Sequence, residues 1–195
     1  MGKKVLVVDH SIEQEVMSCI EKPLDLEGMI HYNQVDYIGD GVYSKDLLDA
    51  YDIVLQLLSR SELTLSEEEL EQLFIVTDTR RKSLEGAMSL IQNSKLAKQL
   101  IIRDICDKRY GKNYFARLYV GKEAKECAIS RKQIYEIEFD DIDYYYRIQL
   151  EHEVFRKFYS LSKGLKELLF SLASEFSQMP MKYVKEAYKV GKRRR

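Results

Sequence analysis

Residues 4–16 read KVLVVDHSIEQEV, and this stretch decides the expected fold. The β-branched apolar run at 4–8 is typical of a short strand buried in a parallel sheet. The residues that follow, 11–22, predict a helix with Ser11 as a candidate N-cap and Pro23 as its stop. A strand that leads directly into a helix is the repeating unit of an α/β fold.

The rest of the chain continues this alternation of strands and helices. Apolar runs predict further strands at 51–58, 73–78, 99–105 and 132–140, with a weaker one near 29–38. Helices are expected at 44–50, 79–92 and 144–176, whereas 113–121 fits either a helix or a strand. The pattern predicts a three-layer α/β domain over residues 1–178, with a mostly parallel sheet flanked by helices.

The composition indicates a globular protein, because 45% of the 195 residues are apolar and 32% are charged. No apolar run approaches the roughly 20 residues that span a bilayer, and the start lacks a secretory signal. Cys19, Cys106 and Cys127 are odd in number and widely spaced, which favours reduced thiols over disulfides. Neither these cysteines nor the three histidines show metal-ligand spacing. We therefore expect a cytoplasmic protein without a metal.

The second half of the chain carries a resemblance to a known family. LFIVTDTRRKSLEGAMSLIQ (73–92) joins a strand to an amphipathic helix, and LIIRDICDKRYGKNYF (100–115) supplies the next strand. IYEIEFDDIDYYYRIQ (134–149) and EVFRKFYSLSKGLKELLFSLASEF (153–176) complete the series. In their order and local character these segments resemble the MinD/ParA family of deviant P-loop ATPases, most clearly over 51–178. The resemblance implies a P-loop NTPase-like fold.

Two parts of that family's phosphate machinery are missing here. A loop of the form KGGxGKT is expected after Val8, since glycines let backbone N–H groups approach phosphates and lysines neutralise them. Residues 9–16 contain neither glycine nor lysine and include three acidic side chains. The magnesium-organising aspartate is expected near the end of 51–58, where Gln56 stands, and a neutral amide is a poor magnesium ligand. We interpret the chain as a degenerate member, a pseudo-ATPase without a cofactor.

The resemblance implies a function as well as a fold. TadZ-like relatives in the family act as localising or assembly factors for surface machines. A non-catalytic scaffold or adaptor in the assembly or positioning of a cell-envelope machine is therefore expected. Family members dimerise through the face that holds ATP. Without ATP, this chain is expected to form a constitutive dimer or to bind another protein, such as an active ATPase relative.

Two alternatives stay open. One is a nucleotide-responsive ATPase switch with unorthodox phosphate contacts from Lys3, Lys4 or a partner's lysine. The other is a receiver-like signalling domain, since KVLVVD also opens that fold and Asp9 suits its acidic site. Gln56 argues against a receiver, because it lies where a phosphate-accepting aspartate is expected.

Polar side chains near the carboxyl ends of the expected strands make up the degenerate nucleotide site, because open α/β sheets bind ligands at that edge. These residues are Asp9, His10, Ser11, Gln56, Thr77, Asp78 and Asp104. Two parts of this set are interpreted as helix caps. Asp9 or Ser11 is expected to cap the helix after the first strand, and Thr77 with Asp78 is expected to cap the helix at 79–92. Asp104 stands where the family recognises the base, and we interpret it as vestigial. No catalytic residue is assigned.

Two segments are candidates for partner contact. The acidic run EIEFDDIDYYYR (136–147) is either an exposed interaction loop presenting Tyr144, Tyr145 and Tyr146 or the start of a helix packed on the sheet.

The other candidate is the tail, 179–195. Within 181–195 seven basic residues oppose the single acidic Glu186, a formal charge of +6, so the rest of the chain carries −7 to reach the total of −1. The basic residues are Lys182, Lys185, Lys189, Lys192, Arg193, Arg194 and Arg195. As a basic amphipathic helix the tail is expected to bind an acidic partner or, weakly, the inner face of an anionic membrane. A frayed, solvated end is an equal alternative, and nucleic acid is a weaker one.

Overall fold

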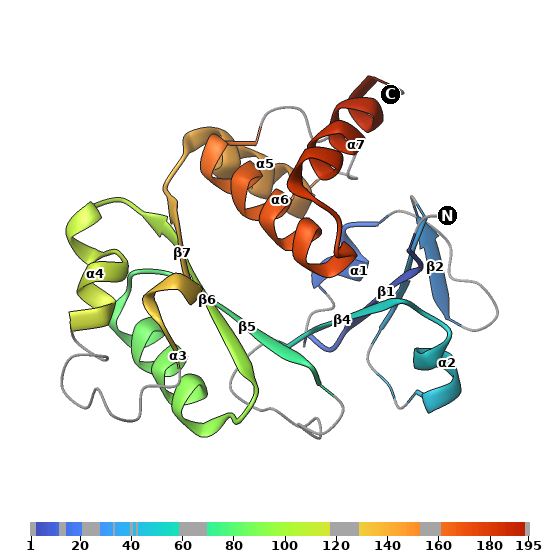
Figure 1. The fold of residues 1–195 in the computed structure, drawn as a ribbon, viewed down its shortest axis with the longest axis horizontal. Coiled ribbons are helices and arrows are strands. Elements are labelled where there is room, and N and C mark those ends of the chain that lie inside the picture. Colours follow the sequence, from blue (N-terminus) through green and yellow to red (C-terminus); the bar gives the residue numbers. More distant parts are fainter. Residues whose placement is uncertain are drawn as a thin grey trace. The chain divides into compact units, whose positions relative to one another are not determined.

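The computed structural model shows an α/β fold with mostly parallel sheets flanked by helices, as the sequence predicts (Figure 1). It describes residues 3–11, 15–20, 28–32, 34–39, 41, 43–58, 70–117, 129–152 and 161–193. The chain divides into two compact units, and each is described by itself. Unit 1 comprises residues 1–62, 145–159 and 170–195, and unit 2 comprises 63–144 and 160–169. The expectation of one domain over 1–178 stays a prediction.

Unit 1 is built on a four-stranded sheet in the order β2-β3-β1-β4. Its strands are β1 (Val5–Asp9), β2 (Met29–Tyr32), β3 (Val35–Ile38) and β4 (Ile53–Leu57). β1 pairs in parallel with both β3 and β4, and β2 pairs antiparallel with β3. The weak strand expected near 29–38 is therefore a hairpin of two strands. Gln34 in its turn has a φ of 67°.

The core of unit 1 forms where this sheet meets a short helix. Leu6 and Val8 of β1 are buried with Met29 and Ile38. Leu47 and Leu48, from α2 (Lys45–Asp49), pack against them. Ser44 caps α2, because its Oγ accepts a hydrogen bond from the Leu47 N–H at 3.3 Å. The remaining helices of the unit include α1 (Glu15–Ser18) and α7 (Met181–Arg193).

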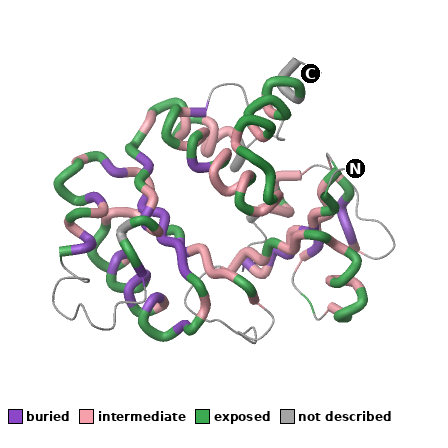
Figure 2. The backbone as a smooth tube through the Cα atoms, viewed as in Figure 1, coloured by how far each residue is buried: buried purple, intermediate pink, exposed green. Residues whose placement is uncertain are grey.

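Unit 2 holds a three-stranded parallel sheet in the order β5-β6-β7. Its strands are β5 (Gln72–Thr77), β6 (Ala97–Ile105) and β7 (Ile134–Glu138). The amphipathic helix α3 (Arg81–Asn93) connects β5 to β6 and buries Leu84, Ala87, Met88 and Ile91 against the sheet. Figure 2 shows the buried residues of this unit concentrated on β6 and on one side of α3.

Shorter elements and the last helices complete the description. The undecided stretch 113–121 begins within α4 (Lys112–Phe115), and its residues 118–121 lie outside the described part. Single 3-10 turns span Lys108–Tyr110 and Arg131–Gln133. The single helical region expected at 144–176 corresponds to two helices, α5 (Asp141–His152) and α6 (Lys163–Ser177). Residues 161 and 162 are not helical, and residues 153–160 lie outside the described part. Among the described residues no helix has the length and apolar character needed to cross a membrane.

Candidate functional site

The first candidate group lies at the carboxyl end of β1, in unit 1. Asp9 is fully buried there, and its carboxylate accepts four hydrogen bonds from its own chain. One oxygen, Oδ1, accepts from the Ser11 N–H at 3.0 Å and from the Ser11 hydroxyl. The other, Oδ2, accepts from Val16 N–H at 2.8 Å and Met17 N–H at 3.1 Å. Asp9 therefore acts as an acceptor for the first turn of α1.

These contacts determine the charge of Asp9. Burial alone would raise the pKa of the carboxyl group. The hydrogen bonds from the Ser11 side chain and from the backbone N–H groups of Met17, Ser11 and Val16 outweigh burial and hold the pKa below its ordinary value. An ionised carboxylate thus lies among backbone donors just after the first strand. In phosphate-binding loops, the backbone N–H groups that follow the first strand donate to the bound phosphate.

Gln56 and His10 lie beside this group on the same sheet. Gln56 of β4 is in register with Val8, and the pairing extends to Leu57 opposite Asp9. The His10 N–H donates to the Leu57 carbonyl at 3.0 Å, so His10 continues the ladder of β1. The Oε1 of Gln56 is buried without a hydrogen-bond partner among the described residues. Unit 1 therefore places Asp9, His10, Ser11 and Gln56 near the carboxyl ends of two neighbouring strands, with the Gln56 side chain on the same face of the sheet as Val8 and the Asp9 side chain on the other face.

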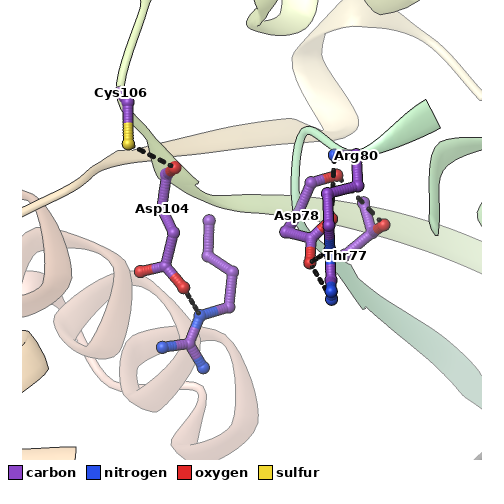
Figure 3. A network of polar contacts seen from close by, with 6 residues as sticks. Thr77, Asp78, Arg80, Asp104 and Cys106 are labelled. Carbon is purple, nitrogen blue, oxygen red and sulfur yellow. Dashed lines mark hydrogen bonds and ion pairs between the residues drawn. The ribbon is translucent and has the colours of Figure 1, made fainter.

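Asp78 follows β5 in unit 2 and makes a similar turn (Figure 3). Its Oδ1 accepts from the Arg80 N–H at 2.9 Å, and its Oδ2 accepts from Arg80 Nε at 2.7 Å. The hydroxyl of Thr77 donates to the Asp78 carbonyl at 3.3 Å. Burial would raise the pKa of Asp78, but hydrogen bonds from Arg80 and Ser83 outweigh it and lower the pKa. Asp78 thus supports the start of α3.

Asp104 differs from the other candidates in its backbone. It has a φ of 57°, in the left-handed region, where the register between β6 and β7 shifts between Ile102 and Ile105. Aspartate enters this region more readily than most residues. Its Oδ2 pairs with Arg103 Nε at 3.0 Å, and the Cys106 thiol lies 3.6 Å from its carbonyl oxygen (Figure 3). A bulge of this kind redirects side chains at a sheet edge.

One turn recurs at four of the strand ends. In each case an aspartate accepts a hydrogen bond from the N–H two residues further on, which is the geometry of an Asx turn. The pairs are Asp9 with Ser11, Asp78 with Arg80, Asp107 with Arg109, and Asp140 with Ile142. The strand-end carboxylates therefore accept from the chain itself. Among the described residues no group of three or more His, Cys, Asp or Glu side chains could hold a metal ion.

The sequence analysis did not predict the ion pairs that two arginines make at these turns. Arg80 and Arg109 each follow an aspartate by two residues and pair with it through the guanidinium. The Asp-x-Arg spacing in DTR (78–80) and DKR (107–109) was the available signal, since it combines an Asx turn with an ion pair.

The structure also describes most of the two segments that are candidates for partner contact. Tyr144 and Tyr145 lie in α5 with exposed fractions of 45% and 59%, and Tyr146 is half-buried. They belong to a helix, which is one of the two arrangements that the sequence allowed. The tail forms α7, with Lys182, Lys185 and Lys189 exposed. The side chains of Lys192 and Arg193, as well as all of Arg194 and Arg195, lie outside the described part.

The parallel sheets and flanking helices define a MinD/ParA-like α/β fold, and comparison with solved structures supports this class. The chain is similar to the MinC:MinD cell division protein complex of Aquifex aeolicus, at 14% identity and a TM-score of 0.51, over 77% of this chain and 75% of that chain. It is also similar to a ParA family ATPase from Chlorobium tepidum TLS, at 15% identity and a TM-score of 0.52, over 94% of this chain and 85% of that chain. At these identities the likeness shows the fold alone. No family profile and no curated protein matches the sequence.

Proposed function

We propose that this chain is a non-catalytic scaffold or adaptor, a pseudo-ATPase that binds protein partners in the assembly or positioning of a cell-envelope machine. One observation carries the proposal. The ionised Asp9 carboxylate accepts from the backbone N–H groups that follow β1, including those of Val16 and Met17. In a P-loop the donors at this place bind phosphate.

The charge of this edge supports the same conclusion. A polyphosphate brought to the end of β1 would approach the Asp9 carboxylate and would have to compete for donors already within 3.1 Å of it. Like charges repel strongly where water is excluded. Gln56, in register with Val8 on the neighbouring strand, carries a neutral amide near the strand end where the family's magnesium-binding carboxylate is expected. The chain retains the strand and the helix start and uses an internal carboxylate in place of a bound anion.

The proposed partner and setting rest on resemblance and on the exposed surface. The MinC:MinD structure is a complex of two proteins with a similar fold in one of them. TadZ-like proteins, which belong to the family that the sequence resembles, serve surface machines. Exposed Tyr144 and Tyr145 supply the kind of aromatic surface that protein interfaces favour. A cytoplasmic position belongs to this proposal, with α7 available to an acidic protein partner or, weakly, to the inner face of the membrane.

Calorimetric titration with Mg-ATP and Mg-ADP tests the proposal directly. The protein concentration should allow detection of a dissociation constant of about 100 μM, near −5.5 kcal/mol. We expect no binding heat and no hydrolysis above a blank, while an active ParA-type ATPase measured in parallel shows both. A 1:1 isotherm would overturn the pseudo-ATPase assignment and favour the nucleotide-responsive switch. Light scattering and a pull-down then test the binding of a protein partner, and a strict monomer without any partner would contradict the adaptor role.

A further inference from the structure

An acidic aromatic surface lies where β7 passes into α5 in unit 2. We define it by Glu138, Phe139, Asp140, Asp141, Ile142 and Tyr144. Its large side chains are exposed, with fractions of 40% for Phe139, 49% for Ile142 and 45% for Tyr144. The rings of Phe139 and Tyr144 stand 5.9 Å apart between centroids. Exposed aromatic and aliphatic side chains gathered among charges are typical of a binding surface.

The backbone holds the acidic aromatic surface in place. The Phe139 N–H donates to the Ile105 carbonyl at 3.1 Å, which fixes the end of β7. Asp140 accepts from the N–H groups of Ile142 and Asp143, at 2.9 and 3.3 Å, and so caps α5. Because the strand end and the helix start are both fixed, binding there requires little additional ordering of the backbone.

The described helix α7, in unit 1, has two unlike sides. Met181, Val184 and Tyr188 recur at helical spacing and are half-buried. The Tyr188 ring meets Phe170 of α6 edge to face at 5.1 Å. Lys185 Nζ also lies over this Phe170 ring, 5.9 Å from its centroid. The apolar side of α7 therefore already has a contact within its own unit.

The opposite side of α7 is basic and aromatic. Lys182 and Lys189 are exposed and lie on one side of the helix, seven residues apart. Tyr183 and Val190 keep the same spacing beside them and are 53% and 47% exposed. This outer face thus combines positive charge with apolar area, whereas the acidic aromatic surface combines negative charge with apolar area.

We propose that the acidic aromatic surface of one copy binds the outer face of α7 of a second copy of this chain. Charge complementarity favours this occupant, because the segment 181–195 carries +6. The acidic aromatic surface offers the carboxylates of Asp140 and Asp141 beside Glu138, and Glu138 is also paired with Lys108 Nζ at 2.8 Å. The inference rests on the proposed adaptor function and identifies a second copy as a partner. Because the two faces differ, contacts repeated in one direction generate rings or open chains, whereas a reciprocal exchange of both faces generates a two-fold dimer.

Light scattering over a concentration series tests this contact with a charge exchange. One variant carries Lys182→Glu and Lys189→Glu, and the other carries Glu138→Lys and Asp141→Lys. We expect wild-type protein to exceed its monomer mass of 23.0 kDa at low salt, and each variant alone to lose association at least about tenfold. An equimolar mixture of the two variants restores the higher mass, since each reversed face then meets its complement. Raising the salt to about 0.5 M reduces association of wild type.

A matched control carries Lys45→Glu and Lys82→Glu, which change the charge equally at exposed lysines of α2 and α3. It should associate like wild type. The proposal is overturned if wild type stays monomeric, if the control weakens association as much as the α7 variant, or if the mixture fails to recover. Wild type that is monomeric yet binds anionic phosphatidylserine vesicles or duplex DNA through α7 also overturns it. Nucleotide calorimetry and the pull-down report separately on the adaptor function, so a silent titration with a monomeric protein that still captures a protein partner defeats only this inference.

Discussion

Asp9 at the end of β1 and Asp78 after β5 make the same Asx turn, yet they differ in burial and in the distance along the chain to their hydrogen-bond donors. Asp9 is fully buried and extends its hydrogen bonds seven and eight residues along the chain, to Val16 and Met17. Asp78 is partly exposed and pairs with Arg80, two residues away. The comparison teaches that one local motif serves two purposes. In unit 1 it supplies an internal anion that joins a strand to a helix, and in unit 2 it supports a helix start at the surface.

The largest expected effect is that of Asp9→Ala. The substitution leaves the buried N–H groups of Ser11, Val16 and Met17 without their acceptor, which costs about 2–4 kcal/mol of unfolding free energy. Urea unfolding followed by circular dichroism gives the loss, and hydrogen exchange of residues 3–11 and 15–20 locates it. Asp78→Ala is the matched control. Equal losses for the two variants would remove the distinction between an internal anion and a surface cap.

Acid tests the contribution of the buried Asp9 carboxylate, to which the lowered pKa of Asp78 adds a decline of the same sign. The folded-state pKa of Asp9 is lowered, so its contribution to stability is present above the ordinary value of 3.8 and is lost as pH falls through the folded pKa. Wild-type protein should therefore lose stability below about pH 4, by about 1.4 kcal/mol for each unit of pKa difference. Urea midpoints measured between about pH 5 and pH 2 check this. Asp9→Asn should show a shallower decline, and an unchanged decline would place the acid sensitivity elsewhere.

A smaller loss is expected for Asp78→Ala, about 1 kcal/mol, which is usual for a helix N-terminal side chain. Faster exchange should be confined to the Arg80 N–H and the first turn of α3, since Asp78 accepts from the N–H of Arg80, the N-cap residue just before that helix. Arg80→Ala serves as the companion variant. Because the Arg80 side chain is 82% exposed, removing it should cost less than removing Asp78. A larger loss for Arg80→Ala would mean that the ion pair, not the turn, supports α3.

The last effect, similar in size to that of Asp78→Ala, concerns Asp104, whose φ of 57° suits glycine. Asp104→Gly should be about 1 kcal/mol more stable than Asp104→Ala, because alanine is strained in the left-handed region. Thermal or urea unfolding of this pair measures the difference. If the two variants are equally stable, the bulge must relax, and its backbone would not mark a fixed position at this sheet edge.

Much of the fold could be predicted because the strands are recognisable by their apolar, β-branched composition. KVLVV and LFIVT are apolar and β-branched, and both are strands of parallel sheets. The hairpin at 29–38 was predicted only as a single weak strand. Its turn depends on Gln34 in the left-handed region, which is an uncommon residue for that conformation. Lys98 shows a second limit, since the tertiary structure buries this lysine within β6 to 2% exposure.

The candidate site was predictable in residue type but not in contacts. The sequence indicated that Asp9 or Ser11 caps the following helix, and the structure shows Asp9 in that role with Ser11 donating to it. The remaining donors are backbone groups of Val16 and Met17, and no side-chain pattern reveals where a backbone N–H points. The register shift that places Asp104 in its bulge is likewise set by pairing between β6 and β7.

The carboxylate of Asp9 has a consequence for timing in the cell. A phosphate delivered by ATP arrives and departs with the energy state of the cell, and the surfaces it orders appear and vanish with it. A carboxylate joined to the chain by covalent bonds has a fixed effective concentration, which no metabolite level changes. An adaptor of this kind would be able to bind its partners at all times. The signals that start and stop assembly would then come from the proteins it binds.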